Sequence, residues 1–157
     1  MPSNLELDKL DKALLSLVQM NNRSSAEALG VEVGLSTAAV QRRLRRLRDA
    51  KVIKADVAIV DRNTVGYPLQ LIVHVELERE SRDSLGRFRE AAFTTSCVQQ
   101  VFYVTGQYDF ILLVIAKDMR HFELMSDELF LENKDVKAFT TSVVMGEDKS
   151  NCFVPLD

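Results

Sequence analysis

The 157-residue chain is short of the residues that mark membrane, secreted and metal-binding proteins: it has two cysteines, two histidines and no tryptophan. No apolar run is long enough to span a bilayer, and the opening MPSNLELDKLDK lacks the apolar core of a secretion signal. Cys97 and Cys152 form no motif together, so we expect free thiols in a reducing cytoplasm rather than a disulfide. With 46% hydrophobic and 27% charged residues, the composition is typical of a soluble globular protein.

The histidines do not indicate an enzyme. His74 shares a predicted sheet face with Ile72 and Glu76, where an interface role is expected, and His121 begins a predicted helix, where it should be solvated. Neither stands at ligand spacing from a cysteine or a second histidine, so no metal site is predicted. A nucleophile elbow, a phosphate loop and a dinucleotide fingerprint are also missing. We therefore expect no catalytic residues, no cofactor and no enzymatic activity.

Charge is distributed unevenly along the chain. The net charge is −3, yet residues 1–60 hold ten Lys and Arg against seven Asp and Glu, and the remainder holds ten against sixteen. This asymmetry indicates a basic binding module joined to an acidic body. The acidic body would be repelled by a nucleic acid duplex, which helps to orient the module.

The basic module contains an amphipathic helix within GLSTAAVQRRLRRLRDAKVI, residues 34–53. Ser36 is a suitable N-cap because its hydroxyl can accept a hydrogen bond from a backbone N–H of the first turn. Val40, Leu44 and Leu47 recur at helical spacing and form one apolar stripe. The opposite face is rich in arginine.

The preceding segment favours a DNA-binding function over a solvated charged face. Ser24 or Ser25 can cap a short helix, and Ser24 with Glu27 fits a capping box. Gly30 removes bulk where a second helix must cross closely, and Gly34 can take a positive φ in the turn. Together with the basic helix, this pattern is typical of a helix-turn-helix.

In such a motif the N-terminal half of the second helix enters the major groove. Arg42 can read guanine and Gln41 adenine through paired hydrogen bonds, whereas Arg45 and Arg46, one turn later, should contact phosphates. The candidate DNA-binding residues are Ser36, Thr37, Ala38, Gln41, Arg42, Arg45 and Arg46.

A first helix is predicted from about Lys9 to Met20, with Asp8 as its N-cap. Its core stripe comprises Leu10, Leu14, Leu17 and Val18. For Arg43, which borders the apolar stripe of the basic helix, an ion pair with an acid of the first helix such as Asp11 is as well supported as a DNA contact.

The second half alternates strands and helices. Residues 52–60 predict a short strand and the turn-forming residues up to 68 a linker, which divides the chain into residues 1–53, 54–68 and 69–157. Strands are predicted over 69–78, 98–105, 110–116 and 136–145, and helices over 82–94 and 119–131. The fold class is α+β: an N-terminal three-helix, winged-type helix-turn-helix domain followed by a ferredoxin-like βαββαβ sandwich.

The predicted sheet needs a cover on its second face. Two helices cover only one face, yet FILLVIA (110–116) is apolar on both, and Ile72 lies opposite the Leu71 set. A second copy of the chain is the simplest cover, so a homodimer is expected.

Several segments, which together span nearly the whole chain, resemble the Lrp/AsnC, or feast/famine, family of transcriptional regulators. They are LDKLDKALLSLVQ, VGLSTAAVQRRLRRLRDAKVI, VTGQYDFILLVIAKDM and VVMGEDKSNCFVPL. The resemblance implies a helix-turn-helix that binds double-stranded DNA, sandwiches that dimerise sheet to sheet, and further assembly, commonly into octamers. It also implies an amino-acid effector bound between dimers.

The effector site is expected at the Gly106–Asp109 turn. Approachable backbone N–H groups at Gly106 suit a carboxylate and Asp109 suits an α-ammonium, although glycine and aspartate also suit a plain hairpin turn. The resemblance places the site at Tyr103, Thr105, Gly106 and Asp109. It extends to Met119 and to Ser142, Val143 and Val144, which can come from an adjoining dimer.

Within that site, Tyr103, Met119 and Val143 would favour a medium or large apolar amino acid. An architectural DNA-compacting protein without an effector is the alternative function. Binding of small molecules would distinguish the two.

Overall fold

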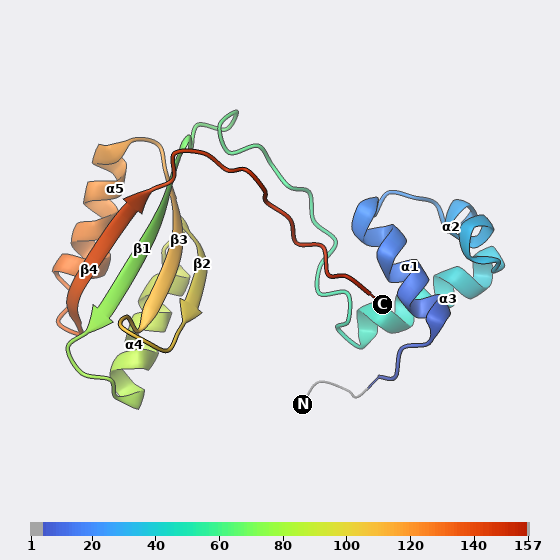
Figure 1. The fold of residues 1–157 in the computed structure, drawn as a ribbon, viewed down its shortest axis with the longest axis horizontal. Coiled ribbons are helices and arrows are strands. Elements are labelled where there is room, and N and C mark those ends of the chain that lie inside the picture. Colours follow the sequence, from blue (N-terminus) through green and yellow to red (C-terminus); the bar gives the residue numbers. More distant parts are fainter. Residues whose placement is uncertain (1–4, 157) are drawn as a thin grey trace. The chain divides into compact units, whose positions relative to one another are not determined.

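The computed structural model describes residues 5–156, which divide into two compact units (Figure 1). The first unit holds the described residues up to Ile59 and, in addition, the tail from Lys149 onward. The second unit is Val60–Asp148. The tail had been expected in the sandwich domain, whereas it packs with the N-terminal helices. Within the described range, no helix combines the length and apolarity needed to cross a bilayer.

The first unit is built on α1 (Lys9–Met20), α2 (Ala26–Val33) and α3 (Thr37–Asp49). Each begins at a side chain that satisfies an otherwise unpaired backbone N–H. Asp8 forms a capping box with Asp11, and Ser36 caps α3. Ser25 caps α2 through the N–H of Ala28, so the predicted capping box of Ser24 with Glu27 is wrong.

The core of this unit is aliphatic. The predicted stripe of α3 is confirmed as buried, whereas α1 buries Leu14 and Leu15 and leaves Leu10, Leu17 and Val18 half buried. The buried hydrophobic residues are Leu14, Leu15, Leu29, Val40, Leu44 and Leu47.

Two glycines shape the turn between α2 and α3. A Cβ on Gly30 would lie 2.4 Å from the carbonyl oxygen of Leu35, so the close approach is to the turn itself. Gly34 ends α2 with φ 70°, a conformation that costs other residues more, and the predicted positive φ is confirmed.

Residues 52–60 form no strand, so that prediction is wrong for the single chain. The segment has the composition of a strand, and Val57 and Ile59 are exposed. A strand is defined by pairing with a neighbour, and among the described residues the sheet contains only β1 to β4.

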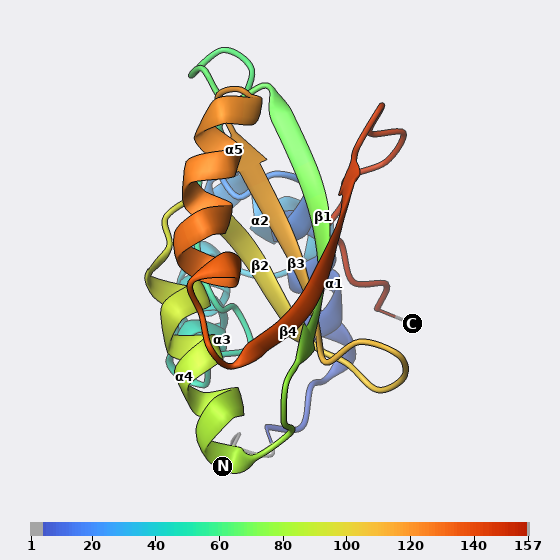
Figure 2. The same ribbon diagram turned by 90° about the vertical axis from the view of Figure 1, so that its left-hand side faces the viewer.

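The second unit is a four-stranded antiparallel sheet in the order β2-β3-β1-β4, with β1 (Leu69–Leu77), β2 (Val98–Tyr103), β3 (Phe110–Ala116) and β4 (Val136–Val143). Its helices are α4 (Arg82–Thr94) and α5 (Met119–Ser126), and α5 continues into a π-helical turn, η1 (Asp127–Leu131). Figure 2 shows α4 and α5 on the same face of the sheet. The predicted ferredoxin-like βαββαβ order is confirmed.

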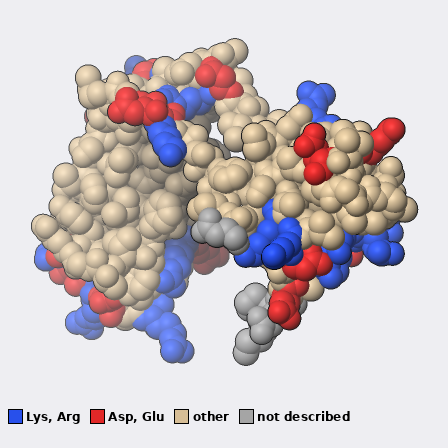
Figure 3. All heavy atoms as spheres, turned by 45° about the vertical axis from the view of Figure 1, so that its right-hand side comes forward, with Lys and Arg blue, Asp and Glu red and all other residues tan. Residues whose placement is uncertain are grey.

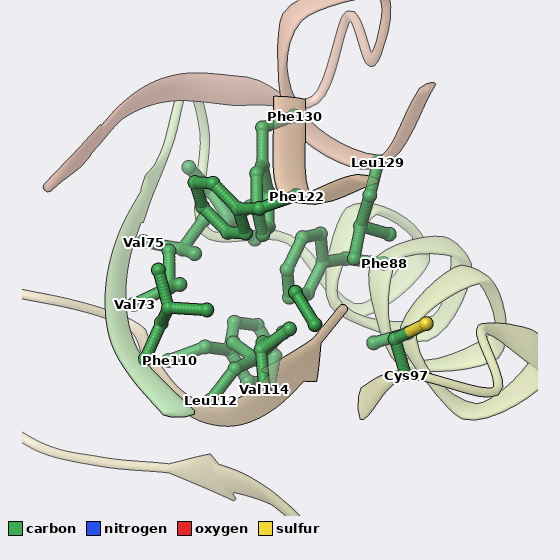
Figure 4. Packing of buried hydrophobic residues seen from close by; sticks show 14 residues of the cluster. Val73, Val75, Phe88, Cys97, Phe110, Leu112, Val114, Phe122, Leu129 and Phe130 are labelled. Carbon is green, nitrogen blue, oxygen red and sulfur yellow. The ribbon is translucent and has the colours of Figure 1, made fainter. Parts of the chain in front are cut away.

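The core of the sandwich lies between the helices and the sheet (Figure 4). Alternate residues of β1 and β3 point into it, among them Val73 and Leu112, which are fully buried. Phe88 of α4 and Phe122 of α5 close the core from the helix side. The intervening residues of both strands form the second face.

Candidate functional site

The first candidate site is the outer face of α3. All seven candidate DNA-binding residues of the helix-turn-helix are exposed, because the helical period turns them away from the buried stripe. The Ser36 hydroxyl accepts a hydrogen bond from the N–H of Ala39 at 3.3 Å, so it serves as the cap. Among the described residues, Arg42 and Arg45 form no ion pair, and their guanidinium groups are available to an anionic ligand.

Arg43 and Arg46 are held by α1 instead. The carboxylate of Asp11 is fully buried and accepts hydrogen bonds from Arg43 Nη1 at 2.8 Å and from Arg46 Nη2. Arg43 also reaches Asp8 at 2.7 Å. The backbone N–H of Asp11 and, to a smaller extent, this guanidinium lower the pKa of the Asp8 carboxyl. The ion pair weighed for Arg43 is therefore present, and it also engages Arg46, for which only a phosphate contact was predicted.

The end of α3 is joined to the start of the linker. Arg48 forms a paired hydrogen bond with Asp56, at 2.7 Å from Nε and 3.3 Å from Nη2. This bidentate contact lowers the pKa of Asp56. Three of the five arginines of α3 are therefore paired within the module: Arg43 and Arg46 with Asp11, and Arg48 with Asp56.

Figure 3 shows that charged side chains are unevenly distributed over the surface. The second unit has a broad surface with almost no charged side chains, and basic and acidic groups border it. On the open sheet face, five residues of β1 and β3 are half buried in the single chain: Ile72, His74, Ile111, Leu113 and Ile115. His74 lies on this face as predicted, with its ring 4.8 Å from that of Tyr108.

The second candidate site is the turn between β2 and β3. The N–H of Val104 donates to the carbonyl of Asp109 at 3.0 Å, and the N–H of Asp109 donates to Val75 at 2.9 Å. One carboxylate oxygen of Asp109 accepts the N–H of Leu77 at 2.7 Å. Asp109 is predicted to face an α-ammonium. In the structure its Oδ2 ties β1 to the turn, and its Oδ1 forms no hydrogen bond with another described residue. Gly106 has φ 128° and is exposed.

Tyr103 lies in a charged cluster that the sequence analysis missed. Its hydroxyl donates to the carboxylate of Glu80, which raises the pKa of the tyrosine, and the guanidinium of Arg89 lies 5.0 Å from the ring centroid. Glu80 follows β1 and Arg89 lies on α4, so only the packing of these elements brings them to Tyr103. No local sequence signal could have identified them.

The remaining predicted effector residues lie elsewhere in the single chain. The pairing of β1 places Phe110 opposite Val75, Ala116 opposite Leu69 and Val143 opposite Leu71. At roughly 3.4 Å per residue, the start of α5 at Met119 is therefore about 20 Å along the sheet from the turn. Ser142, Val143 and Val144 also lie toward this far end, so one chain does not form a pocket from Tyr103, Met119 and Val143.

His121, which is predicted to be solvated, is half buried in the structure. Its Nε2 lies 3.8 Å from Cys97 Sγ, and its ring packs against Tyr67 with centroids 5.9 Å apart. Both cysteines are free. In the part of the chain that the structure describes, no three His, Cys, Asp or Glu side chains converge into a set of metal ligands.

The fold and the α3 surface define the class of protein: a helix-turn-helix module joined to a ferredoxin-like domain with an incompletely covered sheet. Residues 7–48 match the AsnC-type helix-turn-helix domain, and residues 70–152 match the Lrp/AsnC ligand binding domain. The chain belongs to the Lrp/AsnC family of transcriptional regulators, which confirms the resemblance.

Individual relatives span nearly the whole chain. An uncharacterized HTH-type transcriptional regulator from Sinorhizobium fredii is 49% identical over 98% of this chain and 90% of its own length. The transcriptional regulator AzlB from Bacillus subtilis is 30% identical over 96% of both chains. A solved transcriptional regulator from Neisseria meningitidis, in complex with L-methionine, superposes with a TM-score of 0.90 at 28% identity over 97% of this chain and 98% of its own.

Proposed function

We propose that this regulator recognises specific duplex sites through α3. The observation that carries the proposal is the exposed N-terminal half of the helix, where Thr37, Ala38 and Gln41 stand beside the unpaired Arg42. These side chains offer a methyl contact, a bidentate amide and a bidentate guanidinium to base edges. Two such helices related by a two-fold axis would read half-sites roughly 34 Å apart or a multiple of it.

The test is selection of bound sequences from a random or genomic duplex library, followed by titrations of the selected site and of bulk DNA. Arg42→Ala should weaken the selected site by about 1–3 kcal/mol and relax its sequence preference. Arg45→Ala should weaken all duplexes alike and reduce the salt dependence. Arg82→Ala, an exposed arginine of α4, is the matched control. A wild-type protein with equal affinity for all fragments at physiological salt would refute sequence-specific recognition.

We also propose dimerisation through the open face of the sheet. Burial of the Ile72 and Ile111 face against a second copy would remove apolar surface from water on both chains. Ile72→Asp places a charge in that interface and should give monomers in light scattering at micromolar concentration. Phe93→Asp, at an exposed position of α4, is the control and should leave the mass unchanged. A monomeric wild-type protein would contradict the proposal.

An amino acid is the effector we propose, bound where one chain's turn meets another copy. The separation of the Gly106–Asp109 turn from Met119 and Val143 supports this, because a pocket with all of these residues needs two chains. It also favours assembly beyond the dimer, octamers included. Glu80 and Arg89 add a second carboxylate and a guanidinium beside Tyr103, the charges that complement an amino acid.

A thermal-shift screen of the common amino acids, with L-methionine first, tests this proposal. Asp109→Asn is the sharpest variant, because an amide oxygen can still accept the N–H of Leu77 while the charge is removed. It should abolish the ligand-induced shift and leave DNA binding in place. Glu78→Gln, the nearby exposed carboxylate, is the control. Full ligand affinity in Asp109→Asn would show that this carboxylate does not hold the ammonium group.

A further inference from the structure

The C-terminal tail contacts α1 through a main-chain interaction. The side-chain amide of Gln19 donates to the carbonyl of Val154 at 3.1 Å, and the N–H of Val154 donates to the Gln19 side-chain oxygen at 2.7 Å. This exchange of two hydrogen bonds resembles that of paired residues in a β-ladder, with the glutamine amide in place of a peptide group. Val154 as a whole remains 59% exposed, and its main-chain N–H and C=O make the contact.

Leu156 contacts α1 nearer to the start of the helix than Val154 does. Residues 145–155 are exposed, whereas Leu156 is half buried and packs against the hydrophobic core of the helix-turn-helix unit. Leu156 forms one wall of an open groove of about 450 Å³ along α1, and the other lining residues are Leu7, Lys9, Lys12, Ala13 and Ser16. A main-chain clamp and an apolar anchor two residues apart are the elements by which extended peptides are held.

The groove lies on the helix that positions α3. Asp11 of α1 binds Arg43 and Arg46 of α3, so a shift of α1 alters the support of the recognition helix. At its other end the tail is connected to the end of β4 at Val143 through residues 144–148. It is therefore a second covalent connection between the sandwich and the DNA-binding unit, in addition to the linker.

We propose that the outer groove of α1 is the docking site of the chain's own C-terminal tail, and that the docked tail stabilises α3 in its DNA-binding position. Two hydrogen bonds and one partly buried leucine oppose the entropy of ordering the tail. The docked and released states are then close enough in free energy for events in the sandwich to shift their populations. The part concerning DNA rests on the proposed function.

Val154 provides a matched pair of variants in the full-length protein. Val154→Pro removes the N–H that donates to Gln19, whereas Val154→Ala keeps both main-chain groups and loses only an exposed side chain. In ligand-free protein, Val154→Pro should speed amide exchange at the end of α1 by about fivefold, the effect of one hydrogen bond of ordinary strength. It should also weaken binding to the selected DNA site, and Val154→Ala should match wild type in both measurements.

Equal exchange in Val154→Pro and Val154→Ala would overturn the docking site. Faster exchange with unchanged DNA affinity would overturn the effect on α3. The exchange measurement uses neither DNA nor effector, so it tests docking independently of the proposed function. A wild-type protein without sequence preference would contradict the proposed function but would not affect the docking result. A Gln19→Cys and Val154→Cys variant, in a Cys97→Ser and Cys152→Ser background, should form a short cross-link within one chain. A cross-link between two chains would overturn the assignment to the chain's own tail.

Discussion

Asp11→Ala should destabilise the helix-turn-helix unit more than any single exposed substitution in it. Asp11 is the buried carboxylate on which Arg43 and Arg46 converge. Each charge-assisted hydrogen bond contributes about 1.5–3 kcal/mol. The lower value applies here, because Arg43 retains Asp8 and the arginine side chains are 21% and 45% exposed, so water can solvate them after the substitution. Two bonds then give a loss of about 3 kcal/mol.

The size of the unit makes this loss easy to measure. For a module of some 60 residues, 1 kcal/mol shifts the melting temperature by about 4–8 °C, so Asp11→Ala should lower it by about 12 °C or more. Hydrogen exchange resolved by peptide is the assay, because it reports on the two units separately. Tyrosine fluorescence provides the internal check, since Tyr67, Tyr103 and Tyr108 all lie in the second unit and should show its transition unchanged.

Asp49→Ala is the matched control, because this exposed carboxylate of α3 forms no ion pair among the described residues. Its effect should stay within about 0.5 kcal/mol. If Asp11→Ala and Asp49→Ala gave the same stability, the buried ion-pair cluster would not support α3, and the positioning role of α1 would be refuted.

Three further predictions concern local features, each with a paired variant. Gly30→Ala should cost about 1–3 kcal/mol, because its Cβ meets the Leu35 carbonyl, whereas Gly86→Ala in open space on α4 should stabilise by about 0.5–1 kcal/mol in thermal melts; equal effects would contradict the close approach. Ser25→Ala should cost about 1 kcal/mol through loss of the α2 cap, and Ser24→Ala should be nearly neutral in the same assay; the reverse order would restore Ser24 as the cap. The paired hydrogen bonds of Arg87 lower the pKa of Asp135, so this pair stabilises the second unit above about pH 4 and the contribution is lost as pH falls through the lowered pKa. Arg87→Ala should therefore flatten the acid side of the stability curve followed by tyrosine fluorescence, whereas Arg82→Ala should not. A wild-type curve for Arg87→Ala would show that the ion pair contributes nothing.

The sequence alone determined the elements whose signals are local. The bounds of α1, α4 and β3 follow from hydrophobic period and capping residues within each segment, and the structure confirms them. The positive φ of Gly34 follows in the same way, because a turn between two adjacent helices needs it. The exposed face of α3 is likewise a consequence of helical geometry, which is why the exposure of the seven candidate residues could be predicted.

The tertiary structure decided most contacts between residues far apart in the chain; the Asp11–Arg43 ion pair could be weighed from the sequence but not chosen over a DNA contact. Asp11 is separated from Arg46 by 35 positions, Gln19 from Val154 by 135, and Tyr103 from Glu80 by 23. Periodicity and capping do not identify the partners in these three pairs. Strand register, which depends on distant residues, also separates the Gly106–Asp109 turn from Met119 and Val143. Residues 52–60 have the composition of a strand, but a strand forms only where a neighbouring segment pairs with it. Side-chain chemistry sets which contacts are possible, and the path of the backbone sets which of them form.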